Sequence, residues 1–347
     1  MSYLVIIIGL VIIILVHELG HFLSAKFFGV KVEEFGVGFP PRIWGKKIGE
    51  TLYSLNWIPF GGFVRIAGEL PDSGLNKDPD SNPVSPEDKK RLFSSQKIWK
   101  RSAVISAGVI MNVISAWVLF SFIFIIGVPS SVIVTDISPD SPAATAGIMP
   151  GDKILNFADS SSFISFLDAN AGQVVSFQIN RSGENMNLSV LSRANVSPSV
   201  GHIGAALVDS GIPKSSFLGS FYESAKFTAS SIYFIILAFF SIFQSLFAGV
   251  APNVVGPIGI FSIASVVSKS GFIYIIHLVG LISLNLAVLN ILPFPALDGG
   301  RLAFLLAEKI KGSPLPPKFE LWTNAVGFSL LILLMALVTT HDLLRLF

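Results

Sequence analysis

The residues best suited to chemistry lie near the start of the chain, where the segment His17-Glu18-Leu19-Gly20-His21 matches the pattern H-E-x-x-H. On a helix, His17 and His21 lie one turn apart on one face, so both imidazoles can bind the same zinc ion. Glu18 between them can act on a zinc-bound water molecule. A zinc ion that catalyses hydrolysis usually has three protein ligands and keeps its fourth position for water. This chemistry therefore requires a third ligand from elsewhere in the chain.

Asp298 is the best candidate for the third ligand. It follows an apolar segment that two nearby prolines must distort, and irregular backbone at membrane depth is tolerated only where it is buried or lines a cavity. The other histidines, His202, His277 and His341, are better suited to surface or interfacial positions. The alternative role of Asp298 is an N-cap for a helix over residues 299–311, and this role would be preferred without the His-Glu motif.

The composition shows that these residues lie in a membrane protein. The 347 residues are 52% hydrophobic and only 13% charged, which excludes an ordinary water-soluble domain. The formal net charge of +2 is too balanced for a nucleic-acid-binding protein. The chain contains no cysteine, so disulfides and thiolate metal ligands are excluded and His, Asp and Glu remain.

The H-E-x-x-H motif lies inside an apolar segment. Ser2 to Val16 are uncharged, and Phe22 to Phe28 continue the apolar pattern beyond the motif. Ionisable residues in a lipid-embedded helix are costly unless they face an interior site, so their default interpretation is a functional one. The alternative, a helix end with two interfacial histidines, does not explain the apolar continuation. The segment lacks a basic n-region and a cleavage site, so we expect a retained helix rather than a signal peptide.

The distribution of charge orients the chain in the membrane. Residues 29–101 hold 12 of the 24 Lys and Arg residues, whereas residues 129–224 hold four. By the positive-inside rule the first of these segments is cytoplasmic and the second lies outside. We therefore expect a multi-pass protein of the cytoplasmic (inner) membrane with both termini extracytoplasmic.

The expected fold class is a membrane protein: an α-helical bundle of about four transmembrane helices, a membrane-associated β-sheet and one extracytoplasmic β-rich domain. In chain order the expected parts are a helix with H-E-x-x-H (1–28), a cytoplasmic or membrane-associated β-sheet and loop (29–101), a helix (102–128), the outer domain (129–208), an interfacial or re-entrant segment (209–275), a helix ending in Leu-Asp-Gly-Gly (276–300), a cytoplasmic loop (301–324) and a last helix (325–346). The apolar strands of residues 31–68 favour a sheet that lies against the bilayer or the helices, and a small cytoplasmic sheet is the alternative.

The H-E-L-G-H motif, Asn290 and the run Pro-Phe-Pro-Ala-Leu-Asp-Gly-Gly that ends at Gly300, together with an outer domain between them, resemble the site-2 protease family. The closest resemblance is to bacterial zinc intramembrane proteases that release sigma factors. It implies that His17, His21 and Asp298 bind Zn²⁺, that Glu18 is the catalytic carboxylate and that Asn290 helps to hold the substrate backbone.

The resemblance also implies partners. The substrates would be transmembrane proteins cleaved within their membrane spans, in regulated intramembrane proteolysis of anti-sigma factors or in removal of remnant signal peptides. Residues 138–156 resemble a PDZ domain, which would bind a peptide or a substrate ectodomain. Some relatives carry two PDZ domains, and residues 129–208 have room for only one. Residues 31–68 correspond to the membrane-associated β-sheet of the family.

The apolar stretch Phe227 to Val250 is long enough to span but cannot cross alone. If it did, Asp298 would emerge about 30 Å from the two histidines, on the opposite face of the membrane. We expect it to lie in the interface or to form a re-entrant pair with Val254 to Val267.

Two other functions remain open. A catalytically silent membrane scaffold could keep the zinc-site fold and only present its PDZ domain to partners. A metal transporter could also place His, Glu and Asp inside the membrane, but it would need ionisable residues distributed through several spans.

Overall fold

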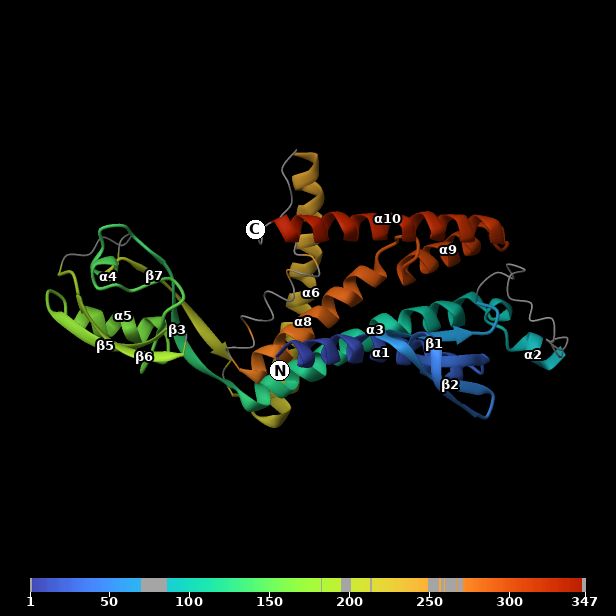
Figure 1. Ribbon diagram of the computed structural model, residues 1–347, viewed down its shortest axis with the longest axis horizontal. Helices are drawn as coiled ribbons and strands as arrows, with labels where there is room; N and C mark the ends of the chain where they lie inside the picture. The colour runs from blue at the N-terminus through green and yellow to red at the C-terminus, as the bar shows by residue number, and fades with distance from the viewer. Residues whose placement is uncertain are drawn as a thin grey trace. The chain divides into compact units, whose positions relative to one another are not determined.

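The computed structural model describes residues 2–69, 86–181, 183–194, 201–212, 214–248, 256, 259, 267 and 271–344. The chain forms two compact units: unit 1 comprises Met1–Ser121 and Phe221–Phe347, and unit 2 comprises Phe122–Ser220 (Figure 1).

Five of the described helices are long and apolar enough to cross a bilayer. They are α1 (Ser2–Phe27), α3 (Ile98–Ile126), α6 (Phe217–Phe247), α8 (Phe272–Ile291) and α10 (Pro317–Leu344). This agrees with a multi-pass membrane protein. The expected number of about four spans is not confirmed. The helix α6 is continuous over most of the ambiguous stretch Phe227 to Val250, and like the other four it is long and apolar enough to cross a bilayer. The second half of the expected re-entrant pair, Val254 to Val267, lies almost entirely outside the described residues.

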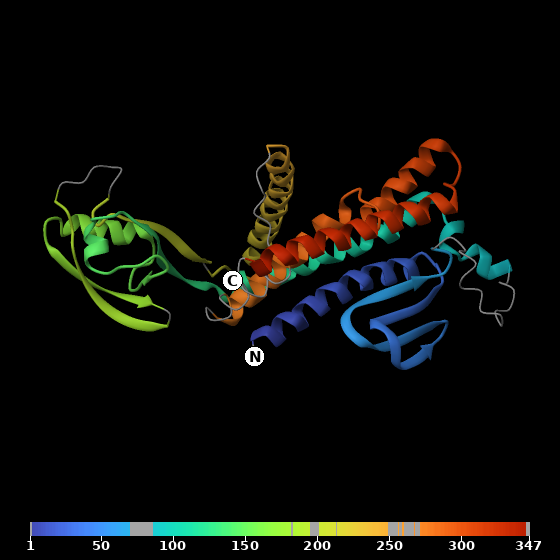
Figure 2. The same ribbon diagram turned by 45° about the horizontal axis from the view of Figure 1, so that its top comes forward.

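The helices α1 and α8 run in the same direction. Near the start of both, a Cβ on Gly9 would lie 2.8 Å from Cγ2 of Val279. Further along both, Nδ2 of Asn290 lies 3.4 Å from Nε2 of His17. The two helices are seen to run in the same sense in Figure 2. The end of α8 is therefore held beside the H-E-x-x-H motif.

The helix α3 runs opposite to α1. His21 contacts Val104 in the first turns of α3, and His17, one turn earlier in α1, contacts Asn112 further along α3. The last turns of α3 consequently reach the first half of α8, where Phe120 packs. The chain therefore leaves α3 and enters α8 at the same end of the bundle.

The helix α10 runs opposite to α8. Ala296, after the end of α8, donates its N–H to Oδ1 of Asn324 near the start of α10 (3.0 Å). The helix begins at Pro317, whose missing N–H is tolerated in a first turn. The end of α10 and the start of α1 therefore lie at the same end of the bundle (Figure 2).

The expected helix over residues 276–300 is interrupted. It stops at Ile291, because Pro293 has no N–H for the helical hydrogen bonds and restricts the residue before it. After a short turn a separate amphipathic helix, α9 (Asp298–Lys311), begins and ends at Gly312, which has a φ of 78°. The expected loop over residues 301–324 is thus largely helical, because an apolar side of α9 buries Leu305 against unit 1.

Residues 32–66 form an antiparallel sheet from β1 (Val32–Ile48) and β2 (Thr51–Ile66). Val37 pairs with both Leu55 and Gly62, so the first half of β1 lies between the two halves of β2. The last part of β2 is consequently an edge of the sheet, and β2 packs against α1. A loop was expected between this sheet and α3. Its described part contains the short helices α2 (Pro86–Lys90) and η1 (Phe93–Ser95).

Unit 2 is β-rich, as expected for residues 129–208. Its five-stranded antiparallel sheet has the order β6-β5-β4-β3-β7, and two helices cover it. Phe163 and Leu167 on the longer helix are buried against Val132 and Ile179 of the sheet. The elements are β3 (Val128–Ile137), α4 (Pro142–Thr145), β4 (Lys153–Ile154), α5 (Ser160–Ala169), β5 (Val174–Arg181), β6 (Glu184–Leu191) and β7 (Ala205–Ile212).

Candidate metal centre

Three potential metal ligands from opposite ends of the chain converge in unit 1. Oδ2 of Asp298 lies 3.1 Å from Nε2 of His17 and 3.4 Å from Nε2 of His21. The two Nε2 atoms lie 3.2 Å apart. The structure thus brings together the three residues that the sequence singled out as ligands, and among the described residues they form a group able to hold a metal ion.

The donor set fits zinc. Tetrahedral zinc with bonds of about 2.0–2.1 Å keeps its ligand atoms roughly 3.3 Å apart, which matches the triangle of two nitrogens and one oxygen. Oδ2 of Asp298 is buried and accepts no hydrogen bond from the described residues, although two ring nitrogens face it. A buried carboxylate oxygen without a donor is costly unless a cation completes its coordination.

The helix α1 positions the two imidazoles through its periodicity. One turn of helix separates them, and their rings pack edge to face with centroids 4.8 Å apart. His17 is 7% exposed, so its ring is held among helices rather than in solvent. The face that carries both rings is the face that packs on α3 and α8.

The turn between α8 and α9 positions Asp298. This turn packs so closely on the start of α9 that a Cβ on Gly299 would overlap the carbonyl oxygen of Leu292, and one on Gly300 that of Phe294. Only glycine fits at both positions, which explains the two glycines after Asp298. The alternative role of Asp298 as an N-cap is not observed, since α9 includes Asp298 and its cap is Leu297, which makes no side-chain capping hydrogen bond.

Glu18 and Asn290 lie beside the three ligands. Glu18 is half-buried and lines the same cavity as the imidazoles. Nδ2 of Asn290, in the last turn of α8, lies 3.4 Å from Nε2 of His17. His277 lies apart, packed against Phe120. His202, in unit 2, forms an ion pair with Asp168.

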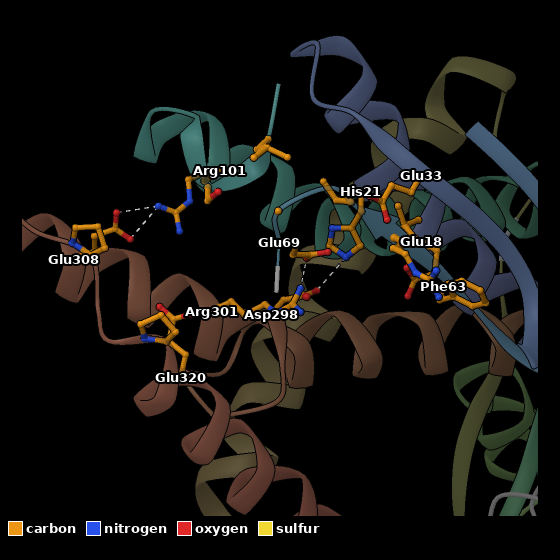
Figure 3. Close-up of a pocket in the computed structure, with 18 of the residues that line it drawn as sticks. Glu18, His21, Glu33, Phe63, Glu69, Arg101, Asp298, Arg301, Glu308 and Glu320 are labelled. Carbon is orange, nitrogen blue, oxygen red and sulfur yellow. Dashed lines mark hydrogen bonds and ion pairs between the residues drawn. The ribbon is translucent and has the colours of Figure 1, made fainter. Parts of the chain in front are cut away.

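A cavity of about 890 Å³ adjoins the centre. Figure 3 shows Glu18, His21 and Asp298 together in this cavity, and the ion pair between Arg101 and Glu308 further along it. Its wall includes the edge of β2, where a Cβ on Gly62 would lie 3.8 Å from Cγ of Glu18. The cavity therefore offers polar groups and, next to the centre, a strand edge that pairs with no further strand among the described residues.

Several residues of the site were not anticipated from the sequence. Asn112 of α3 lies 3.2 Å from Nδ1 of His17, and Gly108 provides the space in which both rings lie. Arg301, which follows the two glycines, pairs with Glu69 after the end of β2. The available signal was an amide side chain, Asn112, within a largely apolar span and four residues after a glycine.

Comparison with known proteins identifies the family. The model of "Peptidase family M50" matches residues 5–334. A protein of Nostoc sp. whose name describes a zinc metalloprotease is 34% identical over 96% of this chain and 93% of its own length. Zinc metalloprotease RasP of Oceanobacillus iheyensis is 31% identical over 97% of both chains, and the regulator of sigma-W protease RasP of Bacillus subtilis is 28% identical over 95% of both. The chain belongs to peptidase family M50, a family of zinc-dependent metalloproteases.

Proposed function

We propose that this protein is a zinc-dependent intramembrane endopeptidase that hydrolyses peptide bonds within the transmembrane segments of membrane proteins. The observation that carries the proposal is the convergence of His17, His21 and Asp298 between helices that are long and apolar enough to span a bilayer. Among soluble proteases such a centre would lie in an aqueous cleft.

His17, His21 and Asp298 are the metal ligands in this proposal. When bound there, zinc lowers the pKa of a water molecule and polarises the scissile carbonyl group. The chain's own contribution is to hold two neutral imidazoles and one carboxylate at fixed separations and to leave the side towards the cavity open. The cavity gives water and an unfolded substrate segment a way to the centre.

Glu18 is the general base and acid. It takes a proton from the attacking water and returns it to the leaving amine, so no net proton is consumed in the two transfers. Asn290 holds the substrate backbone, since its amide group lies beside the ligands on the opposite helix. A side-chain amide in this position can donate to a carbonyl oxygen that becomes negative in the transition state.

The edge of β2 binds the substrate as an added strand. A helical substrate keeps its peptide groups in its own hydrogen bonds, so it must become extended before it can be cleaved. The segment Phe63–Ile66 lines the cavity and pairs with β1 on one side only. Arg65→Pro should lower cleavage while zinc content is retained, and Lys46→Pro, on the other edge of the sheet, is the matched control. Equal cleavage by both variants would remove this step from the proposal.

The chain is oriented with the sheet in the cytoplasm and with both termini and unit 2 outside. In this orientation α6 does not cross the membrane alone but lies in the interface or returns. One argument supports this placement: the chain leaves α3 and enters α8 at the same end of the bundle, so if both helices cross the bilayer an even number of crossings must separate them.

Unit 2 is a PDZ-like domain that binds a peptide or a substrate ectodomain. Its edge strand β7 lies beside α5, and Asp209 of β7 accepts hydrogen bonds from the N–H (2.5 Å) and Oγ (2.9 Å) of Ser160. An exposed strand edge beside a helix is suited to binding an extended peptide. A photo-crosslinker at Val208, which is half exposed on β7, should label the substrate ectodomain; a structural spacer would give no specific label.

The substrates are anti-sigma factors or remnant signal peptides in regulated intramembrane proteolysis. The name of the Bacillus subtilis relative, regulator of sigma-W protease, supports the first class. The proposal is tested with purified protein in lipid vesicles and a single-span substrate. Mass spectrometry should locate the cut inside the apolar span, and a zinc chelator should stop cleavage until zinc is restored. A scaffold would give no product, and a transporter would instead move metal across the vesicle membrane.

A further inference from the structure

The helix α3 contributes no metal ligand, yet it contacts both imidazoles on the side away from Asp298. Nδ1 of His21 lies 2.9 Å from the carbonyl oxygen of Val104, and Nδ1 of His17 lies 3.2 Å from the side-chain amide of Asn112. In each ring the Nε2 atom faces Asp298 and the Nδ1 atom faces α3. The helix therefore determines which ring nitrogen carries the proton.

The contact with Val104 fixes the protonation of His21. A backbone carbonyl oxygen can only accept, so Nδ1 of His21 must donate its N–H to Val104. The neutral ring then has its lone pair at Nε2, the atom that points towards Asp298. His17 needs the same arrangement to be a ligand through Nε2, so its Nδ1–H must also have an acceptor.

The amide of Asn112 supplies that acceptor if its oxygen faces His17. With the nitrogen facing Nδ1, Oδ1 of Asn112 is buried and has no partner among the described residues. The oxygen and nitrogen of an amide are nearly identical in size, and their placement is decided by the hydrogen-bond network. Exchanging them gives Nδ1–H of His17 an acceptor and places Oδ1 in a hydrogen bond.

We propose that Asn112 is a positioning residue for the metal centre, which accepts a hydrogen bond from Nδ1 of His17 and so directs its Nε2 lone pair to the zinc. This inference rests on the proposed role of His17 as a ligand. Asn112 is fully buried in the bundle, where a polar side chain is costly without a partner. Its backbone carbonyl oxygen, on the main chain of α3, accepts a hydrogen bond from Oγ of Ser283 in α8 (2.9 Å).

Such outer hydrogen bonds tune metal affinity. Partners of metal-bound histidines fix the tautomer and the orientation of the ring, and their loss typically lowers affinity or activity about 10–100-fold. Asn112→Leu keeps the approximate size but removes the acceptor. Asn112→Asp keeps an acceptor oxygen in the same place. The two variants therefore separate the hydrogen bond from the packing of the side chain.

The test measures metal binding by the full chain purified in detergent, without any substrate. Zinc affinity is determined by competition with a chelator, and cobalt(II) is substituted to report tetrahedral coordination by its visible absorption. Ser283→Ala is the matched control, because it removes a hydrogen bond to Asn112 without changing the contact with His17.

We expect Asn112→Leu to bind zinc about 10–100-fold more weakly with an altered cobalt spectrum, while Asn112→Asp and Ser283→Ala stay near the wild type. Unchanged affinity in Asn112→Leu would overturn the inference, and so would a tenfold loss in Asn112→Asp. If Asn112→Leu does not fold, Asn112→Asp decides alone, since a wild-type affinity and cobalt spectrum support the inference. Absence of metal binding by the wild type would instead contradict the proposed function.

Discussion

Oδ2 of Asp298 lies 3.1 Å from Nε2 of His17, although nearly the whole chain separates the two residues. Two features of the fold create this proximity. The parallel course of α1 and α8 brings the end of α8 to the middle of the H-E-x-x-H segment, and the proline-containing turn then directs the start of α9 back to the imidazoles. The carboxylate oxygen is left buried without a hydrogen-bond donor among the described residues, in a position to bind a cation.

Removing this carboxylate should remove the metal. Asp298→Ala leaves two imidazoles, and we expect zinc affinity to fall by roughly 100-fold or more, beyond the effect of losing an outer partner. Zinc content after dialysis against a weak chelator is the measurement. Asp209→Ala in unit 2 is the control for loss of an acidic residue. Full retention of zinc by Asp298→Ala would show that this residue is not a ligand.

A single methyl group on α3 should have a similar effect. A Cβ on Gly108 would overlap Nε2 of His21 and lie 2.8 Å from Cε1 of His17, so Gly108→Ala forces both rings out of position. We expect loss of zinc binding while the helices still form, as judged by circular dichroism. Gly9→Ala places a methyl group against Val279 in the same bundle and should keep zinc. Equal zinc affinity in Gly108→Ala and the wild type would mean that the rings can move without cost.

The turn between β1 and β2 contains a group, the Glu50 carboxylate, whose ionisation stabilises the fold. Hydrogen bonds from Arg91 and Lys26 lower the pKa of Glu50 to about 2, although burial opposes this shift. Because the pKa is lower in the folded state, the stabilisation is present above the ordinary glutamate pKa and disappears as the pH falls towards 2. Since Glu50 remains partly exposed to solvent, we expect Glu50→Gln to cost about 1 kcal/mol at neutral pH.

The loss of unfolding free energy in Glu50→Gln should shrink as the pH falls from about 5 towards 2, because the wild type then loses the negative charge of Glu50 as well. Thermal unfolding in detergent at several pH values measures it. Glu33→Gln, at an exposed position of the same sheet, is the comparison. A difference between Glu50→Gln and the wild type that does not depend on pH would exclude the ion pairs as its cause.

Unit 2 depends on a buried ion pair. Asp152 is 1% exposed and accepts hydrogen bonds from Nε of Arg181 (2.8 Å), Nη2 of Arg181 (2.7 Å) and the N–H of Met149 (2.8 Å). These donors lower the pKa of Asp152 despite its burial. Arg181 is partly exposed and can be solvated once its partner is removed, so we expect Asp152→Ala to cost about 2 kcal/mol through the lost charge-assisted hydrogen bonds and to make unit 2 more susceptible to proteolysis. Asp136→Ala, at an exposed position of the same unit, should remain resistant.

The sequence was sufficient to single out His17, His21 and Asp298, which the structure brings together, but not to identify their surroundings. His17 and His21 could be paired because helical periodicity alone places them on one face, and Asp298 because prolines mark an irregular segment at membrane depth. Asn112 could not be identified, because its role depends on how α3 is rotated about its axis. An apolar span without charges gives no information on that rotation. Similarly, hydropathy could not show that β1 lies between two halves of β2, because that order follows from long-range pairing.

The apolar stretch Phe227 to Val250 shows the same limit of what the sequence can predict. Hydropathy alone counts α6 as a span, and its length in the structure agrees with that count. The parity of crossings between α3 and α8 depends on the directions of helices, which only contacts between distant residues reveal.

The central claim is that Glu18 acts on water at a zinc ion held by His17, His21 and Asp298. The most direct test is Glu18→Gln, measured for zinc content and for cleavage of a single-span substrate in vesicles. The account predicts one equivalent of zinc, as in the wild type, with cleavage reduced roughly 100–10,000-fold. Wild-type cleavage by a zinc-loaded Glu18→Gln protein would contradict it.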